Sequence, residues 1–226
     1  MSDLLFKLRA FDTPTICNAL EIIDEQRRNF GYTCHNFFVV NGSSAPICGY
    51  AKTATCRSLN VSGKEIKTLK AERLLYYEYV SRGNHDRIVV MQDLDGSDRA
   101  RGPFWGEFNV RIHKALGCVG VVTDGSIRDL QKLPDGILLL GMGLRPSHAN
   151  IHISGFGQRV NVFGMAVSDG DLIHADEHGA VCFPEAYALE VLQRASEFIE
   201  NERPIIEACK RERLSIDELK ELYLRR

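Results

Sequence analysis

Apolar and polar residues follow two patterns along this chain, and the patterns predict strands and helices in different places. Short, mostly apolar runs of the kind found in strands lie at 47–59, 86–94, 118–125 and 136–144. Segments of helical character lie between them, at 62–83, 104–117 and 126–133. This order of elements predicts strands that are joined by crossover helices.

The beginning of the chain is also predicted to be helical. Residues 1–25 contain two short apolar segments with helical spacing, separated by a polar break. Asp12 or Thr13 would cap the second helix, and Pro14 would occupy its first turn. We therefore expect a pair of N-terminal helices next to the core.

The last third of the chain changes character. Residues 153–184 alternate short strand-like segments with Gly and Asp turns, which indicates a second, β-rich layer. Residues 184–226 are predicted to form a helical arm, with a long charged helix and a shorter one that begins at Ser215. No repeat or linker divides the sequence, so we predict one α/β domain over residues 1–226.

Composition narrows the class of protein. The 226 residues are 44% hydrophobic and 26% charged, which is ordinary for a globular protein, and the net charge of −2 offers no basic surface for nucleic acid. We find no signal peptide and no apolar run that could span a bilayer. The seven cysteines form no C-x-x-C pair. A cytoplasmic protein with reduced thiols, and with neither membrane nor nucleic acid as a partner, is expected.

Residues that could bind a ligand or take part in catalysis follow two of the predicted strands. If the strands at 87–94 and 118–123 are neighbours, their carboxyl ends bring Glu107 close to Arg128 and Asp129. The start of the helix near Glu107 presents free backbone N–H groups, which suit a carboxylate or phosphate. Arg128 could grip the same anion, and Asp129 is a hard oxygen ligand suited to Mg²⁺ or Mn²⁺. Taken alone, the residues are equally compatible with an exposed ion pair of little energetic value.

Three other groups of residues are less suited to catalysis or to binding a metal. The acidic stretch 93–102 lacks the glycine position and closing glutamate of a calcium loop, so it is predicted to be a polar turn, with Arg99 or Arg101 available to a distal substrate carboxylate. The histidines four apart at 148/152 and 174/178 lie among strand and turn signals, which disfavours zinc. The Asp residues at 171 and 176 are expected to cap local backbone, and the Cys residues at 118 and 182 to fill the core.

Residues 105–129, WGEFNVRIHKALGCVGVVTDGSIRD, resemble the signature of the RraA-like family. That family includes the 4-hydroxy-4-methyl-2-oxoglutarate aldolases and the regulator of ribonuclease activity A. Its pattern is an acidic residue, twenty intervening positions and then Arg-Asp, which Glu107 and Arg128-Asp129 match. The likeness extends through most of residues 10–185.

The resemblance implies a divalent-metal-dependent lyase of the class II aldolase type. Such an enzyme cleaves 4-hydroxy-2-oxo acids, for example 4-hydroxy-4-methyl-2-oxoglutarate, to pyruvate, and it decarboxylates oxaloacetate through the same enolate. The substrate carboxylate would be held, largely by backbone amides, at the positions of Gly106, Glu107, Phe108 and Asn109. Arg128 would contact pyruvate, Asp129 would bind Mg²⁺ or Mn²⁺, and Glu107 would act through metal-bound water.

The resemblance also implies a fold and an assembly. The family fold is a layered β/β/α sandwich of the swivelling phosphohistidine-domain type, and its members form homotrimers or homohexamers. An acidic residue from a neighbouring subunit's C-terminal region completes some sites, for which Glu200, Glu202 and Glu207 are candidates. Glu107 departs from the best-known aldolase pattern, which has Asp and therefore one methylene less.

Two functions are alternatives to the lyase. The first is a non-catalytic regulator that binds a ribonuclease; such members lack part of the metal signature, typically the Asp after Arg, whereas Asp129 is present here. The second is a methyltransferase, which is disfavoured because no glycine-rich turn suited to S-adenosylmethionine is visible.

Overall fold

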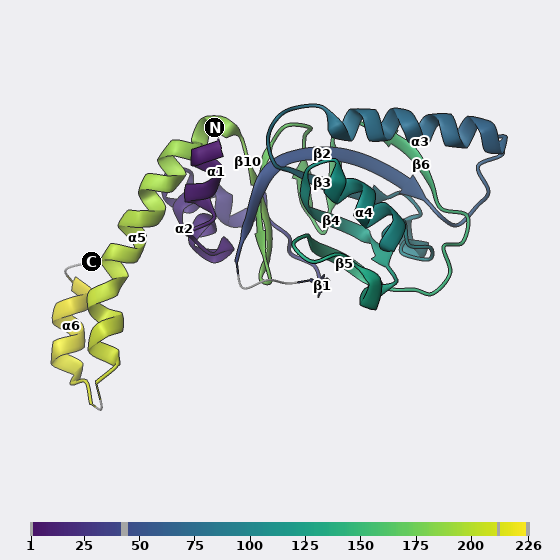
Figure 1. Cartoon of the computed structure of the whole chain (residues 1–226). Coiled ribbons are helices and arrows are strands. Elements are labelled where there is room, and N and C mark those ends of the chain that lie inside the picture. The colour runs from purple at the N-terminus through teal and green to yellow at the C-terminus, as the bar shows by residue number, and fades with distance from the viewer. Residues whose placement is uncertain (1, 42–44, 212, 225–226) are drawn as a thin grey trace.

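A curled sheet flanked by helices forms the body of the protein, and a helical arm extends from one end of it (Figure 1). The computed structural model describes residues 2–41, 45–211 and 213–224. Within these residues one sheet has the order β1-β5-β4-β3-β2-β9-β10, with β6 also paired to β2. Its strands are β1 (Phe38–Val40), β2 (Ile47–Arg57), β3 (Arg87–Asp93), β4 (Cys118–Ile127), β5 (Leu138–Leu144), β6 (His152–Phe156), β9 (Leu172–Asp176) and β10 (Gly179–Phe183).

The centre of the sheet is parallel, as the alternation of strands and helices predicted. β2 pairs with β3, β3 with β4 and β4 with β5, all in the parallel sense. The strands expected at 87–94 and 118–123, on whose adjacency the candidate site depended, are neighbours: Val89 lies opposite Val121 and Val90 opposite Val122. Helices α3 (Ile66–Ser81) and α4 (Glu107–Ala115) provide the two crossovers and cover one face. The mixed α/β class is therefore confirmed.

The prediction of a helix at 126–133 was wrong. β4 continues through Ile127, and only a 3-10 turn, η3 (Leu130–Lys132), follows it. Ser126 and Ile127 resume pairing with Gly143 and Leu144 of β5 after a bulge, and Ile127 is fully buried. Tertiary pairing of a buried β-branched residue thus overrides the short helical pattern.

The separate β layer predicted for 153–184 is smaller than expected. Only β7 (Val160–Val162) and β8 (Met165–Val167) form a sheet of their own, a two-stranded hairpin that packs on the face opposite α3 and α4. β9 instead pairs antiparallel with β2, and β10 pairs antiparallel with β9, so both strands extend the main sheet. Short Gly-punctuated strands carry the same pattern in either position, because the burial of alternate residues is similar.

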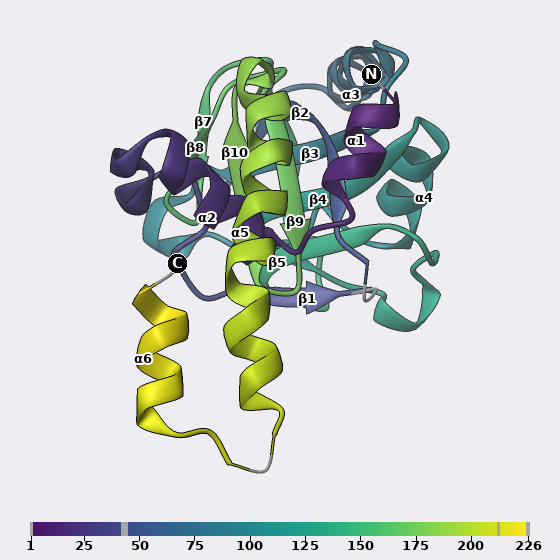
Figure 2. The same ribbon diagram turned by 90° about the vertical axis from the view of Figure 1, so that its left-hand side faces the viewer.

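The terminal helices pack together at the β9–β10 end of the sheet. Their bounds are α1 (Ser2–Leu8), α2 (Thr13–Ile23), α5 (Ala188–Cys209) and α6 (Ile216–Leu224). Asp12 is the N-cap of α2, accepting a hydrogen bond from the Thr15 N–H at 2.9 Å, and Ser215 Oγ accepts one from the Glu218 N–H at 3.2 Å. Figure 2 shows α5 crossing the end of the body beside α1 and α2, while its distal half runs with α6 beyond the body. Among the described helices, none combines the length and apolar character that crossing a membrane requires.

The remaining described helical turns are η1 (Glu25–Asn29), η2 (Gly96–Asp98) and η4 (Glu185–Tyr187).

The predictions for two aspartates and two cysteines are confirmed. Asp171 accepts a hydrogen bond from the Ser168 N–H and Asp176 from the His178 N–H, both at 2.8 Å. Cys118 and Cys182 are buried.

Two histidines are buried in the neutral form. His113 Nδ1 donates to the Asn109 carbonyl at 2.6 Å and Nε2 accepts from the Tyr76 hydroxyl at 2.8 Å. His174 Nε2 donates to the Leu8 carbonyl at 3.2 Å and Nδ1 accepts from the Thr13 hydroxyl at 2.9 Å. Burial lowers the pKa of each histidine to about 4. Both ring nitrogens of each histidine are therefore occupied by hydrogen bonds within the protein.

These histidines predict a loss of stability on mild acidification. As the pH falls below the ordinary histidine pKa of 6.5, both histidines of the unfolded chain bind a proton. In the folded chain they remain neutral until about pH 4, so acid favours the unfolded state. Asp124 opposes this below about pH 6, because burial raises its pKa to about 6 and the folded chain then binds one proton more at that site. Because the effect of the two histidines exceeds that of Asp124, the folded state still becomes less stable as the pH falls. We expect the free energy of unfolding to be about 2 kcal/mol lower at pH 5.5 than at pH 7. Urea denaturation at the two pH values measures it; an unchanged midpoint contradicts it.

Candidate functional site

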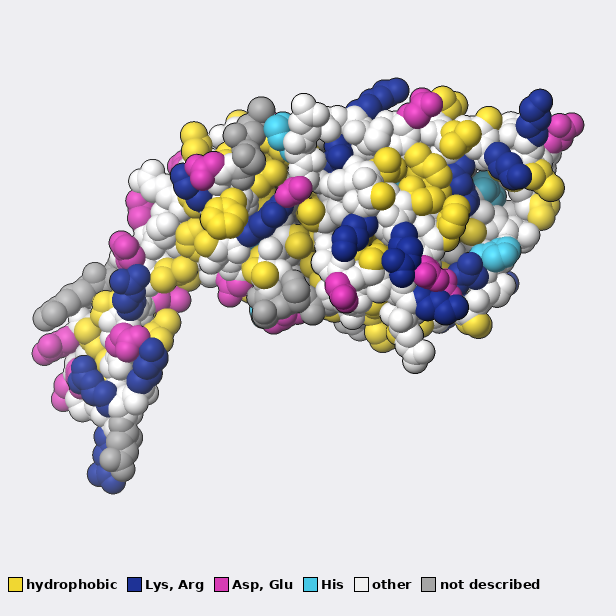
Figure 3. All heavy atoms as spheres, in the orientation of Figure 1, with side chains coloured by type: hydrophobic (Ala, Val, Ile, Leu, Met, Phe, Trp, Pro, Cys, Tyr) yellow, Lys and Arg dark blue, Asp and Glu magenta, His cyan; other side chains and the backbone are white. Residues whose placement is uncertain are grey.

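A cavity of about 340 Å³ opens where the start of α4 meets the loop after β4. Its lining comes from α3, the segment before α4, the first turn of α4, the loop after β4 and the β5–β6 connection: Arg73, Pro103, Phe104, Gly106, Phe108, Asn109, Arg128, Asp129, His148 and Ile151. Basic and acidic side chains gather on the surface around α4 (Figure 3). Of the six motif residues predicted at 106–109 and 128–129, only Glu107 is missing from the lining.

Trp105 positions the Arg-Asp pair. Its side chain is fully buried beneath α4, and its backbone forms a parallel bridge with Ile127 at the end of β4. The Arg128 N–H donates to the Trp105 carbonyl at 2.9 Å, so the chain leaves β4 in a fixed register next to Gly106. This register brings Asp129 to the start of α4, next to Glu107, from which it is 22 residues away in sequence.

Asp129 has a backbone conformation that most residues avoid. Its φ of 60° and ψ of 35° lie in the left-handed region, which Asp, Asn and Gly adopt more readily than other residues. Its Oδ2 accepts a hydrogen bond from the Glu107 N–H at 3.2 Å and lies 3.5 Å from Arg128 Nε. No described residue donates to Oδ1. The carboxylate is about one third exposed, so it is neither locked in the interior nor saturated with partners.

This donor set suits one kind of metal site. No group of three or more His, Cys, Asp or Glu side chains in the described residues could enclose an ion. A cation held by protein ligands alone is therefore not supported. Mg²⁺ and Mn²⁺ are commonly held by one or two carboxylates, with water and substrate oxygens filling the remaining positions. Asp129 fits that second arrangement.

The first turn of α4 offers backbone donors to the same cavity. Gly106 is the N-cap, and the N–H groups of Phe108 and Asn109 have no acceptor within the helix. The Asn109 side chain is occupied, since it donates to the Phe104 carbonyl at 2.6 Å and accepts from the Tyr77 hydroxyl at 2.7 Å. Asn109 therefore reaches a ligand through its backbone.

Glu107 points away from the cavity. Its Oε1 accepts a hydrogen bond from Arg111 Nε at 2.9 Å, one turn along α4. Both side chains are substantially exposed, so this pair is weak and allows the carboxylate to change rotamer. The predicted role of Glu107 as a side chain of the site would need that change.

Buried aromatic rings support the site from below. The Trp105 and His113 rings lie 4.6 Å apart between centroids, and the Phe104 and Trp105 rings 5.1 Å apart. Because the His113 Nδ1–H is bonded to the Asn109 carbonyl, the cluster also holds the first turn of α4. No pattern in the sequence indicated such a role for this histidine.

The acidic turn after β3 forms an internal network, as the polar-turn prediction expected. Asp93 accepts hydrogen bonds from the Ala100 and Asp95 N–H groups at 2.8 and 3.0 Å. Arg99 Nη1 lies 2.9 Å from Asp124 Oδ2, and Arg101 pairs with Asp98 at 3.0 Å. Neither arginine lines the cavity, so the expectation that one of them meets a distal carboxylate is not supported.

Two polar lining residues, Arg73 and His148, were not predicted from the sequence as residues of this site. Arg73 lies on α3, far from the motif in sequence, and nothing in a charged helix marks one arginine as special. His148 drew attention only as a possible zinc ligand. A sequence offers no signal for either residue, because the crossover helix and the β5–β6 loop reach the cavity only after folding.

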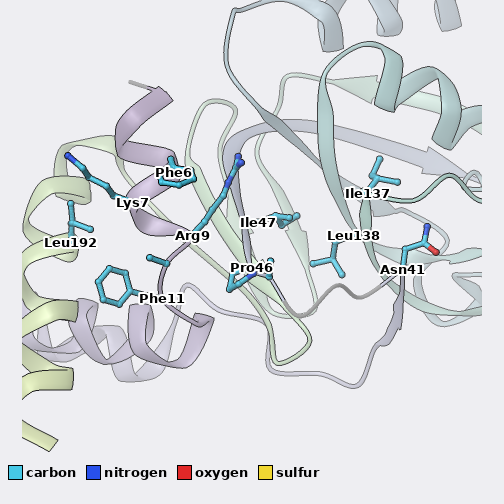
Figure 4. A pocket seen from close by; sticks show the side chains of 13 residues that line it. Phe6, Lys7, Arg9, Phe11, Asn41, Pro46, Ile47, Ile137, Leu138 and Leu192 are labelled. Atoms are coloured by element: carbon cyan, nitrogen blue, oxygen red, sulfur yellow. The ribbon is translucent and has the colours of Figure 1, made fainter. Parts of the chain in front are cut away.

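A second cavity is larger but lacks comparable chemistry. It measures about 620 Å³ and lies between α1, the beginning of β2 and the beginning of β5, with Leu192 of α5 at its side (Figure 4). Its described lining is mostly apolar and contains no acidic side chain. Of its two cationic residues, Arg9 pairs with Asp86 and Lys7 with Asp3. The smaller cavity is therefore the better candidate site.

Comparison with profiles of protein families gives a match over most of the chain. The sequence profile of the RraA-like family, described as Aldolase/RraA, matches residues 13–182. A search of curated proteins gave no match.

Solved structures share the fold. An uncharacterized protein from Pseudomonas syringae pv. tomato str. DC3000 is 21% identical, with a TM-score of 0.70 over 99% of this chain and 98% of that chain. Streptomyces coelicolor RraAS2, described as an unusual member of the RNase ES inhibitor RraA protein family, is 24% identical, with a TM-score of 0.70 over 90% of this chain and 95% of that chain. The RNA-processing inhibitor RraA from Thermus thermophilis is 20% identical, with a TM-score of 0.54 over 75% and 92%.

Proposed function

The chain belongs to the RraA-like (Aldolase/RraA) family, and from this premise we propose that it is a divalent-metal-dependent carbon–carbon lyase. Its substrates would be 4-hydroxy-2-oxo acids such as 4-hydroxy-4-methyl-2-oxoglutarate, cleaved to pyruvate, with oxaloacetate decarboxylated at the same site. The observation that carries the proposal is the convergence of Arg128, Asp129 and the amides of the first turn of α4 on one cavity.

Each of these groups has a task in binding a 2-oxo acid. The N–H groups of Phe108 and Asn109, at the positive end of the α4 dipole, would receive the carboxylate next to the keto group. The planar guanidinium of Arg128 would donate hydrogen bonds to the substrate at its keto oxygen. Asp129 would bind Mg²⁺ or Mn²⁺, and when bound the cation supplies a Lewis acid that polarises the 2-oxo group.

The same arrangement suits the charge that develops during cleavage. Breaking the bond between C3 and C4 leaves the electron pair on the pyruvate fragment as an enolate. The fixed positive charge of Arg128 would stabilise the enolate oxygen without reorganisation, since its backbone is held by Trp105. Glu107, after turning from Arg111, would accept the proton of the 4-hydroxyl through a water molecule. No lysine lines the cavity, so a Schiff base finds no support among the described residues.

The proposal predicts metal-dependent release of pyruvate. With Mg²⁺ or Mn²⁺ present, the purified protein should form pyruvate from oxaloacetate and from 4-hydroxy-4-methyl-2-oxoglutarate, measured by a coupled dehydrogenase assay. Because the cation is expected to contribute several kcal/mol, excess chelator should lower the rate by about a thousandfold or more, and added metal should restore it. Release that is absent with every 4-hydroxy- and 4-carboxy-2-oxo acid tested contradicts the proposal.

A second candidate function is supported by the structural neighbours. Two of them are described as an RNase ES inhibitor family member and as an RNA-processing inhibitor. This chain would then be a non-catalytic regulator that binds a ribonuclease. We favour the lyase because a carboxylate with a free oxygen stands beside Arg128, as a metal site needs and a protein interface does not.

We further propose that the chain assembles as a homotrimer or homohexamer of sandwiches of the swivelling type, acting in the cytoplasm. The distal half of α5 and α6 project beyond the body and leave apolar side chains such as Ile216 and Leu224 exposed. An interface between copies would cover such a surface. Glu200, Glu202 and Glu207 lie on α5 and do not line the cavity, so they would act only in the site of a neighbouring copy.

A further inference from the structure

The cavity contains one cationic side chain that the proposed reaction does not use. Arg128 and Arg73 both line it, and Asp129 is the one acidic side chain of its described lining. If Asp129 binds a divalent cation and Arg128 binds the 2-oxo group, the positive charge of Arg73 has no role in the proposed reaction. A guanidinium stays protonated at any physiological pH, so this charge needs a partner or water.

Arg73 has no acidic partner in the described part of the chain. The adjacent Glu72 is paired with Lys64 instead. Arg73 contacts an aromatic ring: its Cζ lies 5.1 Å from the centre of the Phe104 ring. This contact orients the guanidinium and leaves its charge uncompensated.

The position of Arg73 differs from that of Arg128 in a useful way. Arg128 enters the cavity from the loop after β4, next to the amides of α4, whereas Arg73 enters from α3. Phe104, whose ring faces Arg73, belongs to the segment that precedes α4. A ligand anchored at Arg128 and at the start of α4 would therefore meet Arg73 with another part of its structure.

From this placement we infer that Arg73 selects substrates that carry a second carboxylate, at the end remote from the 2-oxo group. The inference rests on the proposed function and adds the residue that determines specificity. A carboxylate is the group that a guanidinium binds best, through two parallel charge-assisted hydrogen bonds. A neutral distal group would leave the charge of Arg73 half-buried and without a partner.

The test uses two probes of equal chain length, 2-oxoglutarate and 2-oxopentanoate, which differ only in the distal carboxylate. Titration calorimetry with Mn²⁺ present should show that the full chain binds 2-oxoglutarate about tenfold or more tightly than 2-oxopentanoate. Arg73→Gln should remove this preference while changing the affinity for 2-oxopentanoate less than about twofold. Arg73→Lys should keep part of the preference, because the charge remains and the planar fork does not.

The matched control is Lys70→Gln. Lys70 is exposed, lies one turn earlier on α3 and does not line this cavity, so the preference should be unchanged. If Arg73→Gln weakens both probes equally, Arg73 has only a structural role and the inference is overturned.

The wild-type measurement needs no variant. Equal binding of the two probes overturns the inference and leaves the proposed lyase intact. Binding of neither probe overturns the 2-oxo acid site itself, and with it both proposals.

Discussion

Replacing Asp129 by Asn is expected to abolish metal-dependent pyruvate release. The amide keeps the size of the side chain and tolerates the left-handed backbone at this position, so the loop should remain in place. What is lost is the negative charge that would hold the cation, whose contribution of several kcal/mol corresponds to a rate at least about a thousandfold lower. Measuring kcat/KM over a range of Mn²⁺ concentrations, together with Mn²⁺ affinity by calorimetry, tests both consequences.

Asn is a better choice than Ala for this experiment. Ala at a φ of 60° would add backbone strain to the loss of the ligand, and the two effects would be inseparable. Asp98→Asn is the matched control, since Asp98 forms only an exposed pair with Arg101 outside the cavity. Full activity of Asp129→Asn would remove the carboxylate from the mechanism and would favour the regulator.

Gly106→Ala should damage the site without unfolding the protein. The backbone at Gly106, with a φ of −134°, accepts any residue, so the substitution causes no strain of its own. An added Cβ, however, would lie 2.6 Å from Asp129 Oδ2 and 3.0 Å from Arg128 Cγ. Both side chains must move, and displacements of about 1 Å cost on the order of a hundredfold in rate. We expect kcat/KM to fall by that factor or more, with little change in the midpoint of thermal unfolding.

Gly143→Ala separates this effect from the general cost of adding a methyl group. Gly143 lies in β5, and the atom nearest to an added Cβ there would be Arg145 Nη1 at 3.7 Å, an ordinary contact. Its activity should stay near that of the wild type. Equal activity of Gly106→Ala and the wild type would show that Arg128 and Asp129 need not occupy their present positions.

The parts of the site that the sequence predicted share one property: they lie close to a strand end. Parallel pairing of β3 and β4 brings their carboxyl ends to one edge, so Arg128 and Asp129 had to emerge near the segment that starts α4. Glu107 shows the limit of such reasoning. Its position on the first turn of α4 followed from the helix pattern, but its rotamer, paired with Arg111, depends on a neighbour one turn away.

Residues that reach the cavity from elsewhere could not be predicted. Arg73 looks like any exposed charge of an amphipathic helix, and only the packing of α3 over the sheet shows that it enters the cavity. His113 looks like a polar residue on a short helix, and only the folded core shows that it is buried against Trp105 and bonded to Tyr76. Both roles depend on contacts between segments that no local pattern encodes.

The sequence alone determined the order of the central strands and of the first two crossover helices, a helix cap at Asp12 or Thr13, the helical arm and the motif that identifies the family. These features depend on periodicity and on local hydrogen bonding, which are written in consecutive residues. The tertiary structure decided that β4 continues to Ile127, that β9 and β10 join the main sheet, and which arginine faces the ligand. The physical reason is that strand pairing and cavity lining are set by burial between distant segments, and the free energy of that burial outweighs local preference.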